Sequence, residues 1–449
     1  MRGTLAHLAA SIPGAQLVGE DVAFEGVSTD SRTAPAGALF VALKGETFDA
    51  HSFLEQVAGR GVAAVVVHAL PDGWTLPAIV VPDTLVALGR IANFWRGKHA
   101  IPVIGVTGSN GKTTVKEMIA SILAAAVGED ARLATQGNLN NEIGVPLTLM
   151  RLEASHRAAV VELGMNHPGE IARLAAIAQP TVAMVNNAQR EHQEFMHTVE
   201  AVALENGSVL KALPGDGVAV YPGDDTYTAL WQGLASHCRS LTFGLDAACQ
   251  VTCTYVSTGF GNNLKVTVPG GDFALKLAAA GEHNVRNALA AIACALAAGI
   301  GQDVIVRGLE SFAPVGGRLQ QKRAVNGALV IDDTYNANPD SMRAAIDVLA
   351  SYPAPRILVV GDMGEVGTQG REFHEEIGAY AQSRGIETVL ATGELSRHLT
   401  ASGAHHYEQF DDVLAALDEQ LGGNSEATVL VKGSRFMKME RVVNHLTGS

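Results

Sequence analysis

A glycine-rich segment, Gly105–Thr113, constrains this chain more than any other feature. Its glycines, followed by Lys112 and a hydroxyl residue, fit the pattern of a phosphate-binding loop. The apolar run Ile101–Val106 predicts a buried strand before the loop, and Thr113–Ala126 predicts a helix after it. In such a unit, backbone N–H groups close around phosphate oxygens and the helix N-terminus adds partial positive charge. We therefore predict a site for a nucleoside triphosphate and Mg²⁺ rather than an incidental glycine-rich turn. Lys112 would reach the outer phosphates and the Thr113 hydroxyl would bind the metal.

Composition narrows the class of protein and of partner. With 449 residues the chain is too long for one ordinary core, which predicts about two to four domains. The net charge of −14 argues against nucleic acid and anionic membranes as partners. No apolar run approaches the roughly 20 residues of a membrane span, and the N-terminus lacks the apolar core of a signal peptide. The four cysteines have no metal-ligand spacing, so we expect reduced thiols in a cytoplasmic protein.

The order of apolar runs and helical patterns predicts an α/β protein of three domains. Residues 1–98 carry short strands and one helix, which is typical of a smaller α/β domain. Residues 99–313 alternate strands and helices, which predicts a central parallel sheet with helices on both faces. A β-rich insert is expected there at residues 240–268, with a turn at 259–261. Residues 314–449 start at a hinge, Pro314–Gly317, and repeat the alternation, which predicts a Rossmann-like doubly wound sheet.

Polar residues stand where the predicted strands end, the edge at which parallel sheets bind their ligands. Glu162 ends one strand and is placed either to hold Mg²⁺ or to be a solvated acid. His192 follows the next strand and is either a metal ligand or a solvated loop residue. Asn138 and Asn141 belong to an amide-rich segment that would hold sugar hydroxyls or a carboxylate, or form an Asx-rich turn. Each of these positions keeps two interpretations at this stage.

The rest of the chain adds four further clusters of candidate residues. Asn284 and Asn287 open an alanine-rich helix, either as caps or as nucleotide contacts. Arg318 at the hinge would reach the γ-phosphate when the domains close, or lie on the surface. Asp333 would bind ribose hydroxyls, beside a polar specificity site. That site comprises Tyr335, Asn336 and Asn338, and a second anion site is expected at Lys432, Ser434 and Arg435.

Taken together, these segments resemble the Mur ligase family of ATP-dependent peptidoglycan amide ligases over nearly the whole chain. Asn110 and Thr114 in the phosphate loop, with residues 138–146 and 283–287, carry the family resemblance. Residues 333–342, 361–365 with His374, and 432–435 resemble the members that use D-alanyl-D-alanine. Residues 28–32 and 40–45 resemble the UDP-binding part of the N-terminal domain.

The resemblance implies a reaction and roles for matching residues. A carboxylate of UDP-N-acetylmuramoyl-tripeptide attacks the ATP γ-phosphate, and the amine of D-alanyl-D-alanine then attacks the acyl phosphate. Lys112, Glu162, His192 and Arg318 are implied as catalytic, with Thr113, Glu162 and His192 at Mg²⁺. The implied nucleotide-binding residues are Gly108, Ser109, Asn110, Gly111, Lys112, Thr113, Thr114, Asn284, Asn287, Arg318 and Asp333. The implied substrate residues are Ser28, Ser31, Arg32, Asn138, Asn141, Tyr335, Asn336, Asn338, Lys432, Ser434 and Arg435. The protein is expected to be a monomer.

The chain departs from the family pattern in two places. The family usually carries a lysine whose carbamate helps hold a second Mg²⁺, and Asn206 stands at that position here. An asparagine cannot be carbamylated, and Lys211 lies about 140° away around a helix. The segment before His192 also lacks the usual Gly-x-Ala. Two alternatives remain: a sibling ligase that adds a single amino acid to a UDP-muramoyl or folate substrate, and a regulatory ATPase that makes no amide bond.

Overall fold

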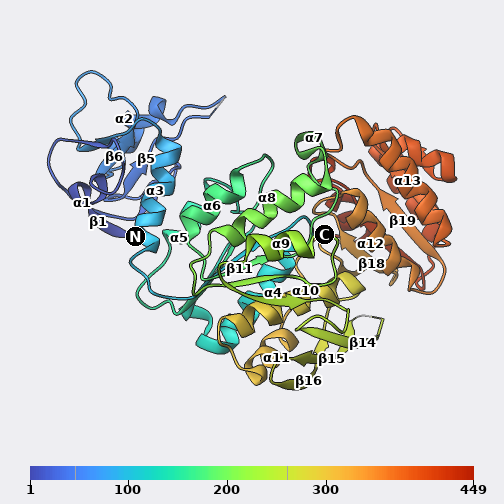
Figure 1. Cartoon of the computed structure of the whole chain (residues 1–449). Helices are drawn as coiled ribbons and strands as arrows, with labels where there is room; N and C mark the ends of the chain where they lie inside the picture. The colour runs from blue at the N-terminus through green and yellow to red at the C-terminus, as the bar shows by residue number, and fades with distance from the viewer. Residues whose placement is uncertain (46, 260) are drawn as a thin grey trace.

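The computed structural model describes residues 1–45, 47–259 and 261–449 and has three lobes along the chain (Figure 1). The first lobe contains a five-stranded sheet in the order β2-β7-β6-β5-β4 and a two-stranded ribbon, β1-β3. Only β2 runs antiparallel to its neighbour in the larger sheet. The strands are β1 (Arg2–Thr4), β2 (Gln16–Val18), β3 (Ala23–Glu25), β4 (Val27–Ser28), β5 (Leu39–Val41), β6 (Ala64–Val67) and β7 (Ala78–Val80), and the helices are α1 (Leu5–Ala9), α2 (Leu54–Gly59) and α3 (Thr84–Arg96).

The middle lobe is built on a six-stranded parallel sheet in the order β13-β12-β11-β8-β10-β9. Its strands are β8 (Val103–Thr107), β9 (Arg132–Ala134), β10 (Ala158–Glu162), β11 (Val182–Val185), β12 (Val218–Pro222) and β13 (Arg239–Phe243). Two hydrophobic clusters cover its faces. One includes α5 (Gly144–Leu149), α6 (Glu170–Ala178), α8 (Val199–Lys211) and α9 (Thr228–Leu234), and the other α4 (Lys112–Val127), α10 (Glu282–Ala297) and α11 (Gln302–Glu310).

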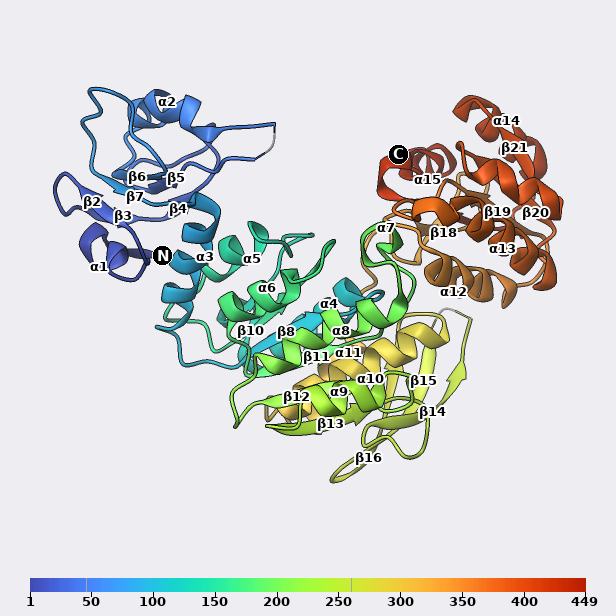
Figure 2. The same cartoon turned by 45° about the horizontal axis from the view of Figure 1, so that its top comes forward.

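A three-stranded antiparallel sheet packs beside α10 and α11 (Figure 2). Its strands are β14 (Thr252–Ser257), β15 (Asn262–Val268) and β16 (Gly271–Leu277). The insert predicted at 240–268 is therefore shifted, because β13 pairs in parallel with β12 and belongs to the central sheet. An apolar run alone does not reveal which sheet a strand joins. Phe260, in the predicted turn at 259–261, lies outside the described residues.

The third lobe is a six-stranded sheet in the order β17-β18-β22-β19-β20-β21, in which only β17 is antiparallel. Its strands are β17 (Gln320–Arg323), β18 (Leu329–Asp333), β19 (Arg356–Val360), β20 (Thr388–Thr392), β21 (His405–Tyr407) and β22 (Thr428–Lys432). Separate clusters join α12 (Pro339–Ala350) and α13 (Gly370–Ser383) to one face, and α14 (Phe410–Leu421) and α15 (Glu440–Thr447) to the other. The α/β fold class, with a parallel central sheet and a doubly wound C-terminal sheet, is confirmed.

Parallel register brings the carboxyl ends of several strands to one edge of each sheet. Glu162 pairs with Val106, and Val185 pairs with Thr107, so the segments after β10 and β11 flank the loop after β8. In the third lobe Asp333 pairs with Lys432. The polar residues after these strands therefore lie close together. None of the described helices combines the length and apolar character needed to span a bilayer, and the four cysteines are free thiols.

Candidate active site

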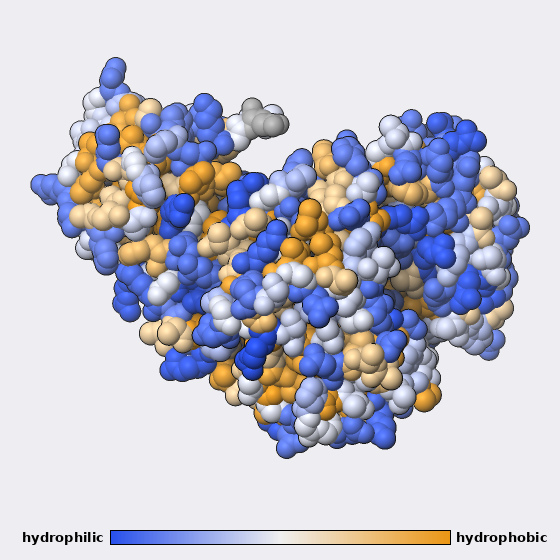
Figure 3. Space-filling view, viewed as in Figure 1, coloured by the Kyte–Doolittle hydropathy of each residue, from blue (hydrophilic) through white to orange (hydrophobic). Residues whose placement is uncertain are grey.

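A cleft of about 880 Å³ lies where the second and third lobes meet. Its lining includes most of the residues singled out in the sequence. They are Ser109, Asn110, Gly111, Lys112, Thr113, Thr114, Asn138, Asn141, Glu162, His192, Asn284, Asn287, Arg318, Asp333, Tyr335, Asn336, Asn338 and Lys432. The structure thus brings together, from segments far apart in the sequence, side chains that the sequence could only place at strand ends. Figure 3 also shows a hollow between the first lobe and the rest of the molecule.

The loop between β8 and α4 requires glycine at two positions. Gly108 has φ 134° and Gly111 has φ 81°, a region that side chains strain to enter. A Cβ atom at Gly111 would collide with the Asn287 side chain, and one at Gly108 would crowd Asn186. Gly105, in contrast, lies inside β8, in agreement with the strand predicted over Ile101–Val106. The loop is shaped by close approach of its backbone to neighbouring amides.

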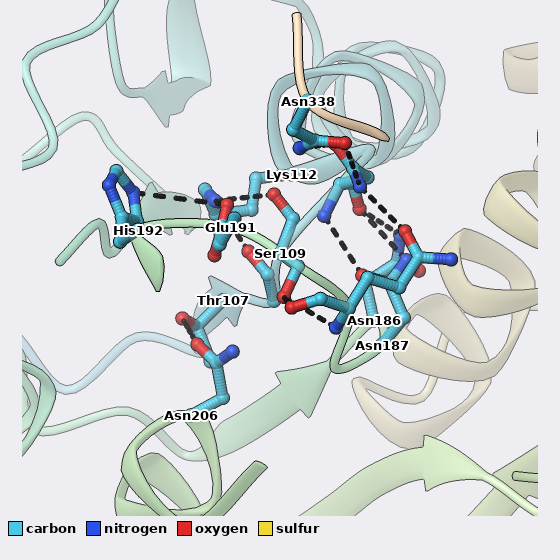
Figure 4. A network of polar contacts seen from close by, with 12 residues as sticks. Thr107, Ser109, Lys112, Asn186, Asn187, Glu191, His192, Asn206 and Asn338 are labelled. Atoms are coloured by element: carbon cyan, nitrogen blue, oxygen red, sulfur yellow. Dashed lines mark hydrogen bonds and ion pairs between the residues drawn. The ribbon is translucent and has the colours of Figure 1, made fainter. Parts of the chain in front are cut away.

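Side-chain amides hold this loop in place (Figure 4). The backbone N–H of Asn110 donates to Asn187 Oδ1 at 2.9 Å, and Asn186 Nδ2 donates to the Asn110 carbonyl at 2.7 Å. Asn186 Nδ2 also donates to Asn287 Oδ1 at 2.9 Å, and Asn287 in turn donates to Asn284. The sequence did not single out Asn186 or Asn187 as supports of the loop. Their position directly after a buried strand was the available signal.

Lys112 is already held at the loop by three acceptors. Its Nζ donates to the carbonyls of Gly108 and Ser109 and lies 3.3 Å from Glu191 Oε2. Glu191 is only 8% exposed, and this burial raises the pKa of its carboxyl while the nearby Lys112 ammonium acts in the opposite direction. Sequence reasoning missed Glu191, whose signal was a carboxylate beside His192. The arrangement presents an ammonium at the place where phosphate oxygens of a bound nucleotide would lie.

Glu162, Thr113 and Arg318 meet at the start of α4. Thr113 Oγ1 donates to Glu162 Oε1 at 3.2 Å, and Arg318 donates to Thr113 Oγ1 at 2.9 Å. Asn140 donates to the same Glu162 oxygen at 2.8 Å. Glu162 Oε2 is buried and has no hydrogen-bond partner among the described residues. A free carboxylate oxygen next to a hydroxyl is the hard donor set that Mg²⁺ prefers, so these two residues fit the implied metal.

His192 lies between the second and third lobes and contacts a carboxylate from each of them. Its Nδ1 is 2.5 Å from Glu365 of the third lobe, and its Nε2 is 3.9 Å from Glu191. Within the described residues, no three His, Cys, Asp or Glu side chains form a group able to hold a metal ion. The metal-binding role of His192 stays a prediction.

Asn206 is in the core and does not line the cleft. Its Oδ1 accepts a hydrogen bond of 2.8 Å from Thr107 Oγ1 (Figure 4), and its Nδ2 is buried without a partner among the described residues. A neutral amide therefore stands beneath the end of β8, at the position where the family usually has a carbamylated lysine.

We predict that activity of this protein does not depend on bicarbonate, because Asn206 has no amine to react with CO₂. Phosphate release in CO₂-free buffer should stay within about twofold of its value after bicarbonate is added, since no charged group is gained or lost. The matched variant Asn206→Lys tests whether a lysine at this position makes the activity depend on bicarbonate. Activity of the unaltered protein that disappears on CO₂ removal and returns with bicarbonate would contradict the prediction.

In the third lobe, the expected second anion site is partly neutralised. Lys432 Nζ donates to Asp333 Oδ2 at 2.6 Å and to the Asn336 carbonyl at 2.8 Å. Ser434 is buried and bonded to backbone groups of the same lobe. Arg435 is exposed, pairs with Glu440 at 3.0 Å and does not line the cleft. Only Lys432 of this trio faces the cleft, because residues 435–437 turn away in a short 3-10 helix.

The three candidate residues of the first lobe do not line this cleft. Ser28 Oγ donates to the Asp30 carbonyl. Arg32 pairs with Asp30 at 2.8 Å, and its side chain is 83% exposed. Ser31 is buried. These three residues lie on the first lobe, outside the cleft, and their predicted role in substrate binding stays a prediction.

His374 supports a turn instead of facing the cleft. Its buried ring accepts the Met363 N–H at Nε2 (3.1 Å), while Nδ1 lies 2.6 Å from the Gly370 carbonyl. These partners require a neutral ring with its proton on Nδ1. Burial lowers the pKa of His374 below its usual value.

We expect His374 to make the protein less stable in acid. Because its pKa is lowered in the folded state, the unfolded chain binds more protons below pH about 6.5, and stability falls as the pH decreases through that range. One such proton contributes a slope of up to about 1.4 kcal/mol per pH unit. Urea unfolding of the unaltered protein and of His374→Gln between pH 5 and pH 7 measures how the free energy of unfolding of each changes with pH. Equal slopes for the two proteins would exclude this role.

Comparison with known proteins places these features in a family. Family models match over residues 23–96 (Mur ligase family, catalytic domain), 106–295 (Mur ligase middle domain) and 317–435 (Mur ligase, glutamate ligase domain). A Haemophilus influenzae protein named UDP-N-acetylmuramoyl-tripeptide--D-alanyl-D-alanine ligase is 40% identical over 97% of both chains. MurF from Acinetobacter baumannii superposes with a TM-score of 0.95 at 34% identity, over 100% of this chain and 99% of that one. The MurF ligase of Thermotoga maritima in complex with ADP gives 0.86 at 26% identity, over 94% and 97% of the two chains. With its phosphate loop, its cleft between two lobes and these full-length similarities, the chain belongs to the Mur ligase family.

Proposed function

We propose that this protein is the ATP-dependent ligase that joins D-alanyl-D-alanine to UDP-N-acetylmuramoyl-tripeptide in peptidoglycan precursor synthesis. The observation that carries the proposal is the contact between the phosphate loop and the turn before α12. Asn338 Nδ2 donates to Asn110 Oδ1 at 2.9 Å, and Asn110 Nδ2 returns a bond of 3.3 Å to Asn338 Oδ1. A nucleotide bound at the loop and an amino substrate bound at this turn would thus share one cleft. The name of the 40% identical relative supports the choice of substrates.

The cleft offers one set of residues for each part of the reaction. Lys112 and the loop N–H groups would bind the ATP phosphates, and Arg318 would contact the γ-phosphate. Asn287 and Asp333 would contact the nucleoside. We assign the turn with Tyr335 to the amino substrate and propose three domains, at residues 1–98, 99–313 and 314–449. The N-terminal domain, with Ser28, Ser31 and Arg32, would bind the UDP part.

The chemistry has two steps. A carboxylate oxygen of the tripeptide forms a bond to the γ-phosphorus of ATP, and the bond to the β-phosphate oxygen breaks, releasing ADP. The amine of D-alanyl-D-alanine then bonds to the acyl carbon, and the tetrahedral intermediate expels inorganic phosphate as the nitrogen loses one proton. Lys112 and Arg318 stabilise charge on the transferred group. Closure of the lobes keeps water from the acyl phosphate.

Mg²⁺ bound to Thr113 and Glu162 would neutralise phosphate charge and polarise the phosphoryl group. Asn140 orients the Glu162 carboxylate by donating to Oε1, which leaves Oε2 free for the ion. Since the substrates are ATP and a UDP-linked precursor, we propose the cytoplasm as the compartment and a monomer as the working form.

A substrate panel tests the proposed function. The full-length protein is incubated with ATP, Mg²⁺ and UDP-N-acetylmuramoyl-tripeptide, and phosphate release is measured with D-alanyl-D-alanine, with single amino acids, or without amine. The proposal predicts release that requires both the tripeptide precursor and D-alanyl-D-alanine. Release with a single amino acid would identify a sibling ligase. Release without any amine would indicate a regulatory ATPase.

A further inference from the structure

Arg190 forms the densest ionic contact between the second and third lobes. It lies in the loop after β11 and bonds to two carboxylates of the third lobe. Its guanidinium donates to Asp340 Oδ1 at 2.7 Å and to the two oxygens of Glu376 at 2.7 and 3.0 Å. Its backbone N–H adds a bond of 2.9 Å to Asp340 Oδ2. The planar fork of an arginine suits such paired recognition of carboxylates.

The contact is partly shielded from water. The side chains of Arg190, Asp340 and Glu376 are 26%, 22% and 32% exposed, and the Arg190 guanidinium lies 5.5 Å from the centre of the Phe373 ring. The hydrogen bond from Arg190 is the main cause of a lowered pKa of Glu376. The three charges therefore form a network of fixed geometry rather than an isolated surface pair.

Arg190 acts on the same helix end that meets the phosphate loop. Asp340 is in the first turn of α12, two residues after Asn338, whose amide bonds to Asn110. Asp340 itself lines the cleft, together with Tyr335 and Asn336 of the preceding turn. The start of α12 is thus held from the second lobe at two points, one amide pair and one arginine.

We propose that Arg190 is a positioning residue that sets the amino-substrate half of the cleft against the phosphate loop. This inference rests on the proposed function for the identity of the amine. The Arg190 side chain is 26% exposed and bonds to carboxylates of the other lobe rather than packing in a core, so its removal should displace α12 without unfolding either lobe. A displacement of about 1 Å at a reacting group costs on the order of a hundredfold in rate. Nucleotide binding should be preserved, because the phosphate loop and Asn287 lie in the second lobe, and Arg318 and Asp333 lie before the turn that leads into α12.

The chain offers a matched control for the test. Arg343 also bonds to Glu376, at 3.1 Å, but it lies on α12 itself. Arg343→Ala therefore removes a cation from the same glutamate without touching the contact between lobes. The Arg343 side chain also does not line the cleft.

The experiment compares Arg190→Ala, Arg190→Lys and Arg343→Ala in the full-length protein, with melting curves to confirm folding. For Arg190→Ala we expect the KM for D-alanyl-D-alanine to rise about tenfold or more and kcat to fall, while the Kd for ADP stays within about twofold. For Arg190→Lys, KM and kcat should lie between those of Arg190→Ala and of the unaltered protein, because one ammonium cannot bond to both carboxylates as a guanidinium does. Arg343→Ala should match the unaltered protein. An unchanged KM for the amine, or equal losses in KM and in ADP binding, would overturn the inference.

Two further measurements complete the test. A double-mutant cycle of Arg190→Ala with Glu376→Ala should be strongly non-additive if the two side chains act as a pair, and additive losses would argue against it. A crystal structure of the ADP-bound Arg190→Ala variant should show the start of α12 displaced from the phosphate loop, and an unchanged position of α12 would also contradict the inference. This measurement needs no amine, so failure of the proposed substrates would be distinguishable from failure of the role of Arg190.

Discussion

Replacing Lys112 with methionine is expected to lower kcat for phosphate release by about a thousandfold. Methionine keeps most of the length of the side chain but removes the ammonium that donates to the loop carbonyls and faces Glu191. The charge that would stabilise the transferred phosphoryl group is then missing. Phosphate release at saturating substrate concentrations measures the effect.

The variant must be separated from a loss of folding, because Glu191 is left buried without its cation. The double variant Lys112→Met with Glu191→Gln removes that unpaired charge and should be as inactive as the single one. Lys211→Met, on the exposed end of α8, is the control and should keep full activity. Retention of more than about a tenth of the rate by Lys112→Met would refute the role of Lys112.

Replacing Arg318 with alanine should also lower kcat by about a thousandfold, with a smaller change in the KM for ATP. The guanidinium lies over the Tyr335 ring, 4.1 Å from its centre, and reaches across the hinge to Thr113. This places a fixed positive charge beside the phosphate loop from the other lobe. Initial rates over a range of ATP concentrations give both constants.

Arg318→Lys is the sharper variant, because lysine keeps the charge but cannot stack or form the same fork. We expect it to recover less than about a tenth of the lost rate. Arg323→Ala, an exposed arginine on the neighbouring strand β17, should behave like the unaltered protein. Full activity of Arg318→Lys would show that a simple charge is enough and would contradict the proposed geometry.

The fold was largely predictable because its signals are local. The apolar run before the phosphate loop became β8, and the repeating alternation after the hinge became the third sheet. The exceptions concern which strand pairs with which, as with β13, since pairing is decided by contacts distant in the sequence.

The candidate site was predictable in its residue types but not in its contacts. Asn110 bonds to Asn187, 77 residues away, and to Asn338, 228 residues away. Nothing near Arg190 or Glu191 in the sequence indicates that one would meet α12 and the other Lys112. Arg435 was expected at an anion site and is instead paired on the surface. Partners brought together only by tertiary packing leave no periodic or local signal.

The two points at which the start of α12 is held differ in their physical nature. The Asn110–Asn338 pair consists of uncharged amides, so neither acid nor dissolved salt weakens it much, whereas the Arg190 contact is partly exposed and subject to ionic screening. Raising the ionic strength would therefore weaken the Arg190 contact and leave the amide pair intact, so the attachment of α12 to the second lobe would depend on salt at only one of these two points.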